Sequence, residues 1–454
     1  MIGVIRRQLS GDGMGARVMR GSFLTFLGFG GGQFLRLLSN LILTRLLFPE
    51  AFGLMAILSL FLAGMQMFSD IGLSASIVQS KRGNDPVFLN TAWTLQVMRG
   101  VLLGLICCVI AGPVAQFYQE PILYELMFGL AFTVFIMEMR STKIGTASRN
   151  IHLGRVTFLD LGCQIVAIVV MVVVAWIWET VWALVVGMMV QQALHAVLSH
   201  LVLPGHPNRL QLEKAAFVEL FNFGKYLFVS SGLTFIIENG DRMLLSKFFT
   251  LANLGFYNIA YFFGSVPVIL MGNLAVRVVY PLYSARPPAE SEANRRALSK
   301  ARFGLTGFLF AIQFGLALLG VWLIELLYTT EYWAAGPILV VMSVSLMPSL
   351  IIRGHAFVLL SAGRSGLFTA YQALRAVLQT GLLALGVIHF GLIGALAAQP
   401  IAAILSYPVL YRMIRPYRAE DPLHDGFFMA LTVLCGAFVF WINQEALLRV
   451  LAIQ

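Results

Sequence analysis

Charged residues are scarce in this sequence. Asp, Glu, Lys and Arg make up 11% of its 454 residues, whereas about 25% is usual for a soluble domain. Hydrophobic residues reach 59%, and apolar runs of about 20 residues, the length of a membrane-spanning helix, recur along the chain. The composition therefore excludes a soluble enzyme of ordinary design and predicts an all-α polytopic membrane protein.

Motifs for catalysis and metal binding are also missing. The four cysteines lie within apolar segments, without a Cys-x-x-Cys pair or a histidine at a metal-ligand spacing. His195, His200 and His206 are five and six residues apart, so no two of them share a helix face as metal ligands. No Ser/His/Asp or Cys/His set can be placed. These absences predict no catalytic residues, no metal site and no cofactor.

What the chain has is a series of apolar segments of membrane-spanning length. They predict twelve spans, and a thirteenth apolar stretch covers residues 427–443. The twelve predicted spans are 22–45, 51–78, 88–112, 119–139, 156–177, 181–201, 219–246, 254–280, 303–325, 336–360, 366–387 and 392–411.

Basic residues are distributed unequally between the two sides of these spans. With the N-terminus inside, 21 of the 31 Lys and Arg residues fall in inside loops, three fall outside and seven fall within spans. Such an excess on one side predicts a cytoplasmic N-terminus, because cytoplasmic loops are enriched in Lys and Arg. No cleavable signal peptide is recognised, so the first span is expected to direct insertion itself. The +10 net charge is thereby explained without a nucleic-acid partner.

Two segments of the chain resemble each other at an offset of 202 residues. Residues 44–54 and 246–256 share a hydroxyl residue, a base, an apolar pair, a turn and a glycine, Gly53 in the first and Gly255 in the second. Six spans separate them, so both halves would enter the membrane in the same orientation, as in transporters built from parallel repeats. The alternative is that short span-turn-span units converge on glycine and aromatic residues.

Seven basic residues lie within predicted spans, where a charge costs at least about 2.5–3.5 kcal/mol. A water-filled cavity, a counter-charge or an anionic ligand is needed to receive each of them. They are Arg36, Arg99, Lys225, Arg242, Arg277, Arg353 and Arg375.

Several motifs resemble those of Wzx-type polysaccharide flippases, and the resemblance extends over about residues 20–415. The quoted stretches include Arg45-Leu46-Leu47-Phe48-Pro49-Glu50-Ala51-Phe52-Gly53-Leu54, Ser69-Asp70-Ile71-Gly72-Leu73, Phe117-Tyr118-Gln119-Glu120-Pro121, Val181-Trp182-Ala183-Leu184, Gly240-Asp241-Arg242-Met243-Leu244 and Leu254-Gly255-Phe256-Tyr257-Asn258-Ile259-Ala260. The branch they resemble serves colanic acid, teichuronic acid and similar exopolysaccharides. That family belongs to the multidrug/oligosaccharidyl-lipid/polysaccharide exporter superfamily.

The resemblance implies a fold and a transport function. The fold has two six-helix lobes around a central cavity, with alternating access, and the predicted thirteenth helix departs from it. The cargo would be an undecaprenyl-diphosphate-linked oligosaccharide, moved to the periplasmic leaflet of the bacterial cytoplasmic (inner) membrane. Expected partners are this lipid-linked substrate, membrane lipids, a polysaccharide polymerase and export machinery. The expected segments are 1–20 at the cytoplasmic N-terminus, lobes 21–203 and 219–415, a linker 204–218 and a C-terminal part 416–454.

Pyrophosphate as cargo would account for the buried bases, since Arg meets phosphate oxygens in bidentate geometry. Arg36, Arg99 and Arg375 lie about ten to fifteen residues into their spans, near the midplane, and lead the candidate cavity residues. Their alternative is an ion pair with a carboxylate on a neighbouring helix.

The other buried bases have alternatives of their own. Arg242 follows Glu238 by four residues and can pair with it or pack against Asp241. Arg277 and Arg353 can instead extend to the lipid headgroups, and Lys225 is assigned to the interface.

Uncharged polar groups and acids complete the candidate set. Gln33 and Asn40 supply polar groups in the first span. Asp70 is a candidate for binding a coupling cation or proton, or for capping a broken helix before Gly72. Glu238 and Asp241 are the corresponding acids of the second half.

Two other functions remain as alternatives. A cation-coupled drug exporter or lipid II exporter belongs to the same superfamily, but the first span holds no acid of the kind that cation coupling usually needs. A membrane glycosyltransferase or polysaccharide polymerase would need a large outer loop or an Asp-x-Asp pair, and the predicted outer loops are short.

Overall fold

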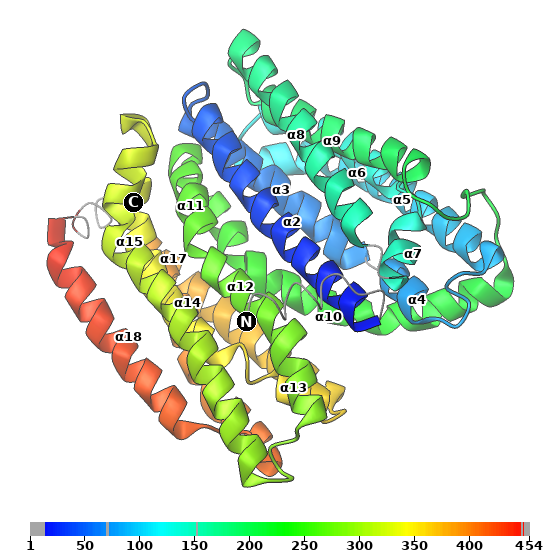
Figure 1. The fold of residues 1–454 in the computed structure, drawn as a ribbon. Coiled ribbons are helices and arrows are strands. Elements are labelled where there is room, and N and C mark those ends of the chain that lie inside the picture. The colour runs from blue at the N-terminus through cyan, green and yellow to red at the C-terminus, as the bar shows by residue number, and fades with distance from the viewer. Residues whose placement is uncertain (1–13, 70–71, 151–152, 446–447, 449–454) are drawn as a thin grey trace. The chain divides into compact units, whose positions relative to one another are not determined.

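The computed structural model describes residues 14–69, 72–150, 153–445 and 448. Within this part of the chain every regular element is a helix (Figure 1), as the composition predicts. Side chains are described from residue 28 onwards, except those of residues 153, 223–230 and 277–278. Asp70 and the side chains of Lys225 and Arg277 therefore lie outside the described residues.

Contacts divide the chain into two compact units. The first comprises residues 1–47 and 58–232, and the second comprises residues 48–57 and 233–454. The helices of the N-terminal half are α2 (Met14–Leu43), α3 (Pro49–Ser69), α4 (Leu73–Gln79), α5 (Pro86–Tyr118), α6 (Ile122–Glu138), α7 (Lys143–Arg149), α8 (Leu153–Trp178), α9 (Trp182–Leu201) and α10 (Lys214–Phe248). Helices α3 and α10 each contribute residues to both units.

The C-terminal half has the same all-helical character. Its elements are α11 (Leu251–Gly264), α12 (Val266–Leu274), the π-helix η1 (Ala275–Val279), α13 (Tyr280–Ala285), α14 (Glu292–Leu327), the 3-10 helix η2 (Thr330–Tyr332), α15 (Ala335–Ile352), α16 (Phe357–Ser361), α17 (Ser365–Ile414), the 3-10 helix η3 (Arg415–Tyr417) and α18 (Pro422–Ile442).

Several helices begin at residues whose side chains cap the exposed backbone amides of the first turn. Asp85 accepts from the amide of Val87 at the start of α5, directly before a proline. Thr250 caps α11 and Ser291 caps α14, each by accepting from the amide three residues on. Short polar side chains in this position satisfy amides that have no partner within the helix.

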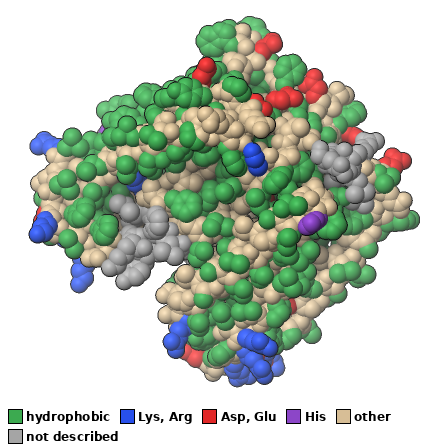
Figure 2. Space-filling view, turned by 180° about the vertical axis from the view of Figure 1, so that it is seen from behind, with side chains coloured by type: hydrophobic (Ala, Val, Ile, Leu, Met, Phe, Trp, Pro, Cys, Tyr) green, Lys and Arg blue, Asp and Glu red, His purple; other side chains and the backbone are tan. Residues whose placement is uncertain are grey.

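The outer surfaces are apolar, as a lipid environment requires. Eight helices of the described chain are long and apolar enough to cross a membrane, and ten are if each bent pair counts as one span. Most side chains in the space-filling view are hydrophobic, and most Lys and Arg side chains in view lie at its margins (Figure 2). Helix α18 (Pro422–Ile442), which contains all but the last residue of the stretch 427–443, is among the eight.

Helix α15 forms the core of the second unit. It packs against α11, α14, α17 and α18, and 89% of the apolar window in residues 330–361 is buried. Its sequence between Ala335 and Ile352 contains no charged residue. A helix that is apolar on all sides is expected in such a central position.

Bends occur where glycine or proline interrupts a helix. Helices α11 and α12 meet at 43°, with Pro267 in the first turn of α12. Helix α17 contains both predicted spans 366–387 and 392–411, joined at Gly391, whose φ of 56° favours glycine. The backbones on either side approach closely, because a Cβ on Gly386 would lie 2.4 Å from the carbonyl oxygen of Gly394.

The two repeated segments contact each other within the second unit. A Cβ on Gly53 would lie 2.1 Å from the carbonyl oxygen of Leu251, and a Cβ on Gly255 would lie 2.3 Å from that of Pro49. The two contacts are equivalent under the offset of 202 residues, so the repeat forms a pseudo-symmetric helix contact. Glycine is required on both sides because the backbones leave no room for a side chain.

We expect Gly53→Ala to destabilise this contact. The added methyl must push the backbone of α11 away, and overpacking of this kind costs about 1–3 kcal/mol. The measurement is thermal unfolding of the purified protein in detergent. Gly315→Ala in α14 is the matched control, because no atom lies within 4 Å of its added Cβ. Equal midpoints for the two variants would show that the close approach contributes nothing.

Candidate functional site

The predicted polar residues of α2 lie in the first unit. The Arg36 side chain is exposed and makes no hydrogen bond or ion pair that involves the described residues. The Oε1 atom of Gln33 is buried without a hydrogen-bond partner in the described structure. Asn40 is half-buried, and its carbonyl oxygen accepts from the backbone and hydroxyl of Thr44. Arg36 stays a candidate for contact with an anion.

Arg99 of α5 forms an ion pair with Glu138 of α6. The distance from Nη2 to Oε2 is 2.5 Å, and the side chains are 19% and 3% exposed. Arg99 Nη1 also donates to the carbonyl oxygen of Ser69 at 3.2 Å. The two helices approach closely here, since a Cβ on Gly100 would lie 2.6 Å from the Glu138 Cβ. The alternative considered for Arg99, a bridge to a carboxylate on a neighbouring helix, is the arrangement observed.

Glu138 was absent from the residues predicted for the site. The sequence nevertheless held a signal for it. Glu138 is a carboxylate within the predicted span 119–139, and Arg99 is a base within the predicted span 88–112. Helices α5 and α6 are joined by a short turn, so a residue about twenty positions before that turn lies opposite one about twenty positions after it. This hairpin register predicts contact between Arg99 and residues near 138.

In the second unit Arg353 pairs with Glu238. The distance from Nη2 to Oε1 is 3.6 Å, between the C-terminal end of α15 and α10. The Arg353 side chain is 23% exposed, and that of Glu238 is 45% exposed. The sequence left open that Arg353 extends to the lipid headgroups. In the structure its side chain instead lies against α10.

Arg242 lies over an aromatic ring. Its guanidinium carbon is 4.4 Å from the centroid of the Tyr261 ring of α11, a cation–π contact. The predicted helical pair of Arg242 with Glu238 is not formed, because Glu238 pairs with Arg353. The tertiary contact therefore replaces the i, i+4 pair, which is worth only about 0.3–0.5 kcal/mol on an exposed helix.

Asp241 is held by groups close to it. It is 2% exposed and accepts a hydrogen bond from the Tyr257 hydroxyl at 2.5 Å. Its other carboxylate oxygen accepts from the backbone amide of Arg242 at 2.8 Å. The bond from Tyr257 joins α10 to α11, and the bond from Arg242 lies within α10.

Arg375 of α17 is buried without a polar partner. It is 9% exposed and makes no hydrogen bond or ion pair that involves the described residues. One turn later, Gln379 donates from Nε2 to the carbonyl oxygen of Ile237 at 2.8 Å, which holds this face of α17 against α10. The charged groups that act on it electrostatically are Arg353 and Glu238.

Three bases thus converge in the second unit from α10, α15 and α17. We call Arg242, Arg353 and Arg375 the arginine cluster. Glu238 and Asp241 are the acids beside it, so the cluster keeps an excess of one positive charge. An anion with several oxygens fits such a set, because guanidinium groups donate in pairs to phosphate.

Two further predicted residues fall at helix interruptions. Helix α3 ends at Ser69 and α4 begins after Gly72, whose φ is 63°. This is the break that Asp70 was considered to cap. Arg277 falls in η1, between α12 and α13. Asp70 as a whole and the side chain of Arg277 lie outside the described residues.

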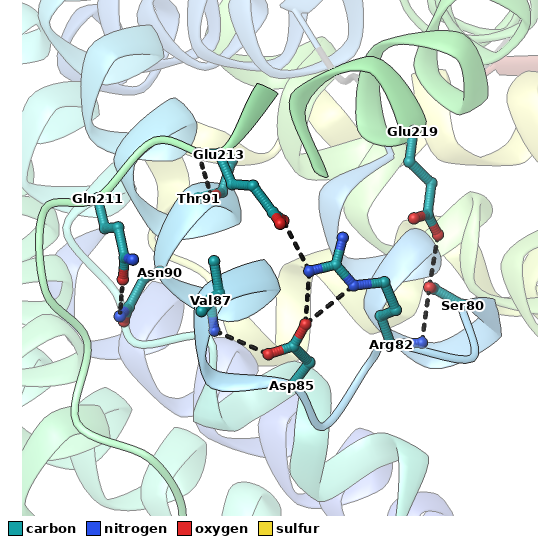
Figure 3. Close-up of polar contacts among 9 residues, drawn as sticks. All are labelled: Ser80, Arg82, Asp85, Val87, Asn90, Thr91, Gln211, Glu213 and Glu219. Carbon is teal, nitrogen blue, oxygen red and sulfur yellow. Dashed lines mark hydrogen bonds and ion pairs between the residues drawn. The ribbon is translucent and has the colours of Figure 1, made fainter. Parts of the chain in front are cut away.

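A separate polar network ties the segment before α10 to the start of α5 (Figure 3). Arg82 pairs with Asp85 and with Glu213 at 2.6 Å each. Its guanidinium lowers the pKa of Asp85 below the usual range. Asn90 donates to the Gln211 side chain at 2.9 Å. The residues of the predicted linker 204–218 are thereby fastened to the first unit.

Comparison with known proteins identifies the family. A family model described as "Polysaccharide biosynthesis protein" matches residues 42–337. The chain belongs to this family. The match includes α3 to α14, and it confirms the resemblance to Wzx-type exporters and their superfamily.

Curated relatives agree with this assignment. The teichuronic acid biosynthesis protein TuaB of Bacillus subtilis (strain 168) is 23% identical over 66% of this chain, and the match spans 62% of TuaB's length. The lipopolysaccharide biosynthesis protein WzxC of Escherichia coli (strain K12) is 22% identical, with 90% of this chain and 84% of WzxC covered. The succinoglycan biosynthesis transport protein ExoT of Rhizobium meliloti (strain 1021) is 21% identical, with 90% of this chain and 82% of ExoT covered. The chain is thus a multi-pass membrane protein of a polysaccharide biosynthesis family.

Solved structures share the fold. The lipid II flippase MurJ superposes with a TM-score of 0.71 at 14% identity, covering 96% of this chain and 100% of MurJ. An inward-facing multidrug resistance transporter of the MATE family superposes with a TM-score of 0.63 at 13% identity, covering 86% of this chain and 96% of the transporter. At these identities the likeness establishes the fold, and it confirms the predicted all-α polytopic architecture.

Proposed function

We propose that this protein moves undecaprenyl-diphosphate-linked oligosaccharide repeat units across the bacterial cytoplasmic membrane by alternating access. The product would be exopolysaccharide or lipopolysaccharide. The family membership and the names of the relatives support a role in polysaccharide biosynthesis. The observation that carries the proposal is the arginine cluster, in which Arg375 is buried and has no polar partner among the described residues.

The proposed substrate contacts follow from the charges. Arg375, Arg353 and Arg242 would meet the pyrophosphate in the second lobe, and Arg36 would do so in the first. Gln33 and Asn40 would contact the sugar or its hydration shell, and Arg277 stays in the candidate set. Arg99 is paired with Glu138, so we assign it a structural role. A central cavity between lobes 21–203 and 219–415 is part of this proposal.

The proposed orientation has a cytoplasmic N-terminus. It is supported by the concentration of 21 Lys and Arg residues in loops on one side. Membrane lipids, a polysaccharide polymerase and export machinery are the proposed partners, with the protein acting as a transporter rather than as an enzyme.

A deletion strain tests the function. Complete lipid-linked repeat units should accumulate on the cytoplasmic side, and the wild-type gene should restore export. The measurement is mass spectrometry of extracted lipid-linked sugars, combined with their accessibility to a periplasmic probe. Accumulation of incomplete sugars would show instead that the protein acts as a glycosyltransferase, and accumulation of complete units on the periplasmic side would indicate a polymerase.

A further inference from the structure

Two histidines and an aspartate meet inside the second unit, apart from the arginine cluster. His355 lies in the turn between α15 and α16, and His424 and Asp425 lie in the first turn of α18. All three are at least 95% buried. Each offers a ligand atom, and these atoms lie within 4.8 Å of one another.

One carboxylate oxygen faces both imidazole rings. Asp425 Oδ1 is 2.8 Å from His424 Nδ1 and 3.2 Å from His355 Nε2. The other oxygen, Oδ2, accepts a hydrogen bond from the Tyr407 hydroxyl. The carboxylate is thereby oriented with Oδ1 pointing between the two histidines.

A second contact orients His424. Its Nε2 shares a hydrogen bond with Thr306 Oγ1 of α14 at 3.0 Å. When Nε2–H donates to this hydroxyl, the lone pair of Nδ1 points towards Asp425 Oδ1. Metal-binding histidines commonly donate their second ring N–H in this way, which selects the tautomer and the ring orientation.

His355 is the least satisfied member of the group. Its Nε2 lies 3.2 Å from Asp425 Oδ1 without good hydrogen-bond geometry, and its Nδ1 has no hydrogen-bond partner within the described structure, although the ring is 1% exposed. Burying a polar group without a partner costs about 1–3 kcal/mol. A cation bound between Nε2 and Oδ1 would satisfy the ring.

The spacing suits a transition-metal ion. Bonds of about 2.0–2.1 Å to nitrogen and oxygen in tetrahedral geometry place neighbouring ligand atoms about 3.3 Å apart. The distance from His355 Nε2 to Asp425 Oδ1, 3.2 Å, is close to this value, and the distance from His424 Nδ1 to the same oxygen, 2.8 Å, is shorter. Imidazole and carboxylate together suit Zn²⁺ and its divalent neighbours better than Mg²⁺ or Ca²⁺, which favour oxygen ligands.

One base, Arg302, lies near the three residues, and acids surround it. Arg302 is the nearby base, and it is fastened to the Ala419 carbonyl oxygen at 2.8 Å. Three acids, Asp425, Asp421 and Glu420, act on Arg302 electrostatically. Arg302, Glu420 and Asp421 also line a cavity of about 270 Å³, together with Glu292, Arg295, Arg296 and Arg418. Asp421 precedes Asp425 by one helical turn.

We propose that His355, His424 and Asp425 bind a divalent transition-metal ion, Zn²⁺ in the first instance, with water as a fourth ligand. The ion would join the α15–α16 turn to α18 and so attach the predicted thirteenth helix to the core of the second unit. Sequence spacing indicated no metal site, because His355 and His424 are 69 positions apart. This site is independent of the proposed transport function.

Metal analysis of the tag-free protein tests the site. Purification in detergent without chelator should yield about one equivalent of transition metal by plasma mass spectrometry. His355→Ala should retain at most about a tenth of that amount. Removal of the metal from the wild type should lower the thermal midpoint, and Zn²⁺ should restore it. The exposed His389 is the matched control, and His389→Ala should bind metal as the wild type does.

A cobalt titration of the wild type is independent of any variant. Stripped protein that binds Co²⁺ with histidine ligands should develop visible d–d absorption that saturates at about one equivalent. Absence of bound metal after purification, together with no absorption on titration, would overturn the proposal. Metal content in His355→Ala equal to that of the wild type would also overturn it.

Discussion

Replacing Arg375 by alanine should reduce polysaccharide export by about 10- to 100-fold while leaving the protein folded. A hydrogen bond between a charged group and its partner contributes about 1.5–3 kcal/mol, which corresponds to this range. Export by Arg375→Lys should be intermediate between that of Arg375→Ala and that of the wild type, because an ammonium keeps the charge but lacks the paired donors of a guanidinium. Export is measured at equal membrane expression in the deletion strain.

The thermal stability of Arg375→Ala shows whether Arg375 contacts the substrate or holds the fold together. A buried charge without a partner costs folding free energy, so its removal should leave the thermal midpoint unchanged or raise it. An arginine that held the fold together would lower the midpoint when removed. The exposed Arg412 lies on the same helix, and Arg412→Ala is the matched control for loss of one positive charge. Normal export by Arg375→Ala would refute the proposed phosphate contact.

Replacing Glu138 by alanine should lower the stability of the protein, whereas Arg375→Ala should not. It leaves the partly buried guanidinium of Arg99 without its carboxylate, and breaking a buried ion pair costs up to about 3–5 kcal/mol. We expect a large fall in the thermal midpoint and a loss of export that follows the loss of folded protein. Glu125→Ala is the control on the same helix, because Glu125 is exposed in the first turn of α6.

A double variant determines whether Arg99 acts beyond this pair. Arg99→Met with Glu138→Leu replaces both charges by apolar groups of similar size, which is often neutral or stabilising for a buried pair. The double variant should therefore regain most of the stability lost in Glu138→Ala and should export polysaccharide. A stable double variant that exports nothing would return Arg99 to the substrate site. A Glu138→Ala protein as stable as the wild type would show that the pair contributes little.

Much of the architecture was predictable because hydropathy and charge act locally along the chain. Apolar runs predicted the helices, and the predicted spans 366–387 and 392–411 correspond to the two halves of α17 on either side of Gly391. The match of Gly53 with Gly255 predicted a repeat, which the structure shows as a reciprocal contact. The bend at Pro267 also followed from one residue, since proline removes a backbone donor.

The roles of the buried bases depended on tertiary contacts. Counting residues placed Arg99 and Arg375 at similar depths in their spans, yet Arg99 meets Glu138 and Arg375 meets no polar partner in the described structure. Glu238 was expected to pair with Arg242 on its own helix, and it pairs with Arg353 instead.

By itself, the sequence determined that this protein is an all-α polytopic membrane protein with an excess of positive charge inside its spans. Insertion into a bilayer depends on the apolar content of each segment, which can be read without knowing its neighbours. Only the tertiary structure decided which charges are compensated. Ion pairing depends on which helix faces pack together, and residues such as His355 and Asp425 meet through contacts between helices that are distant in sequence.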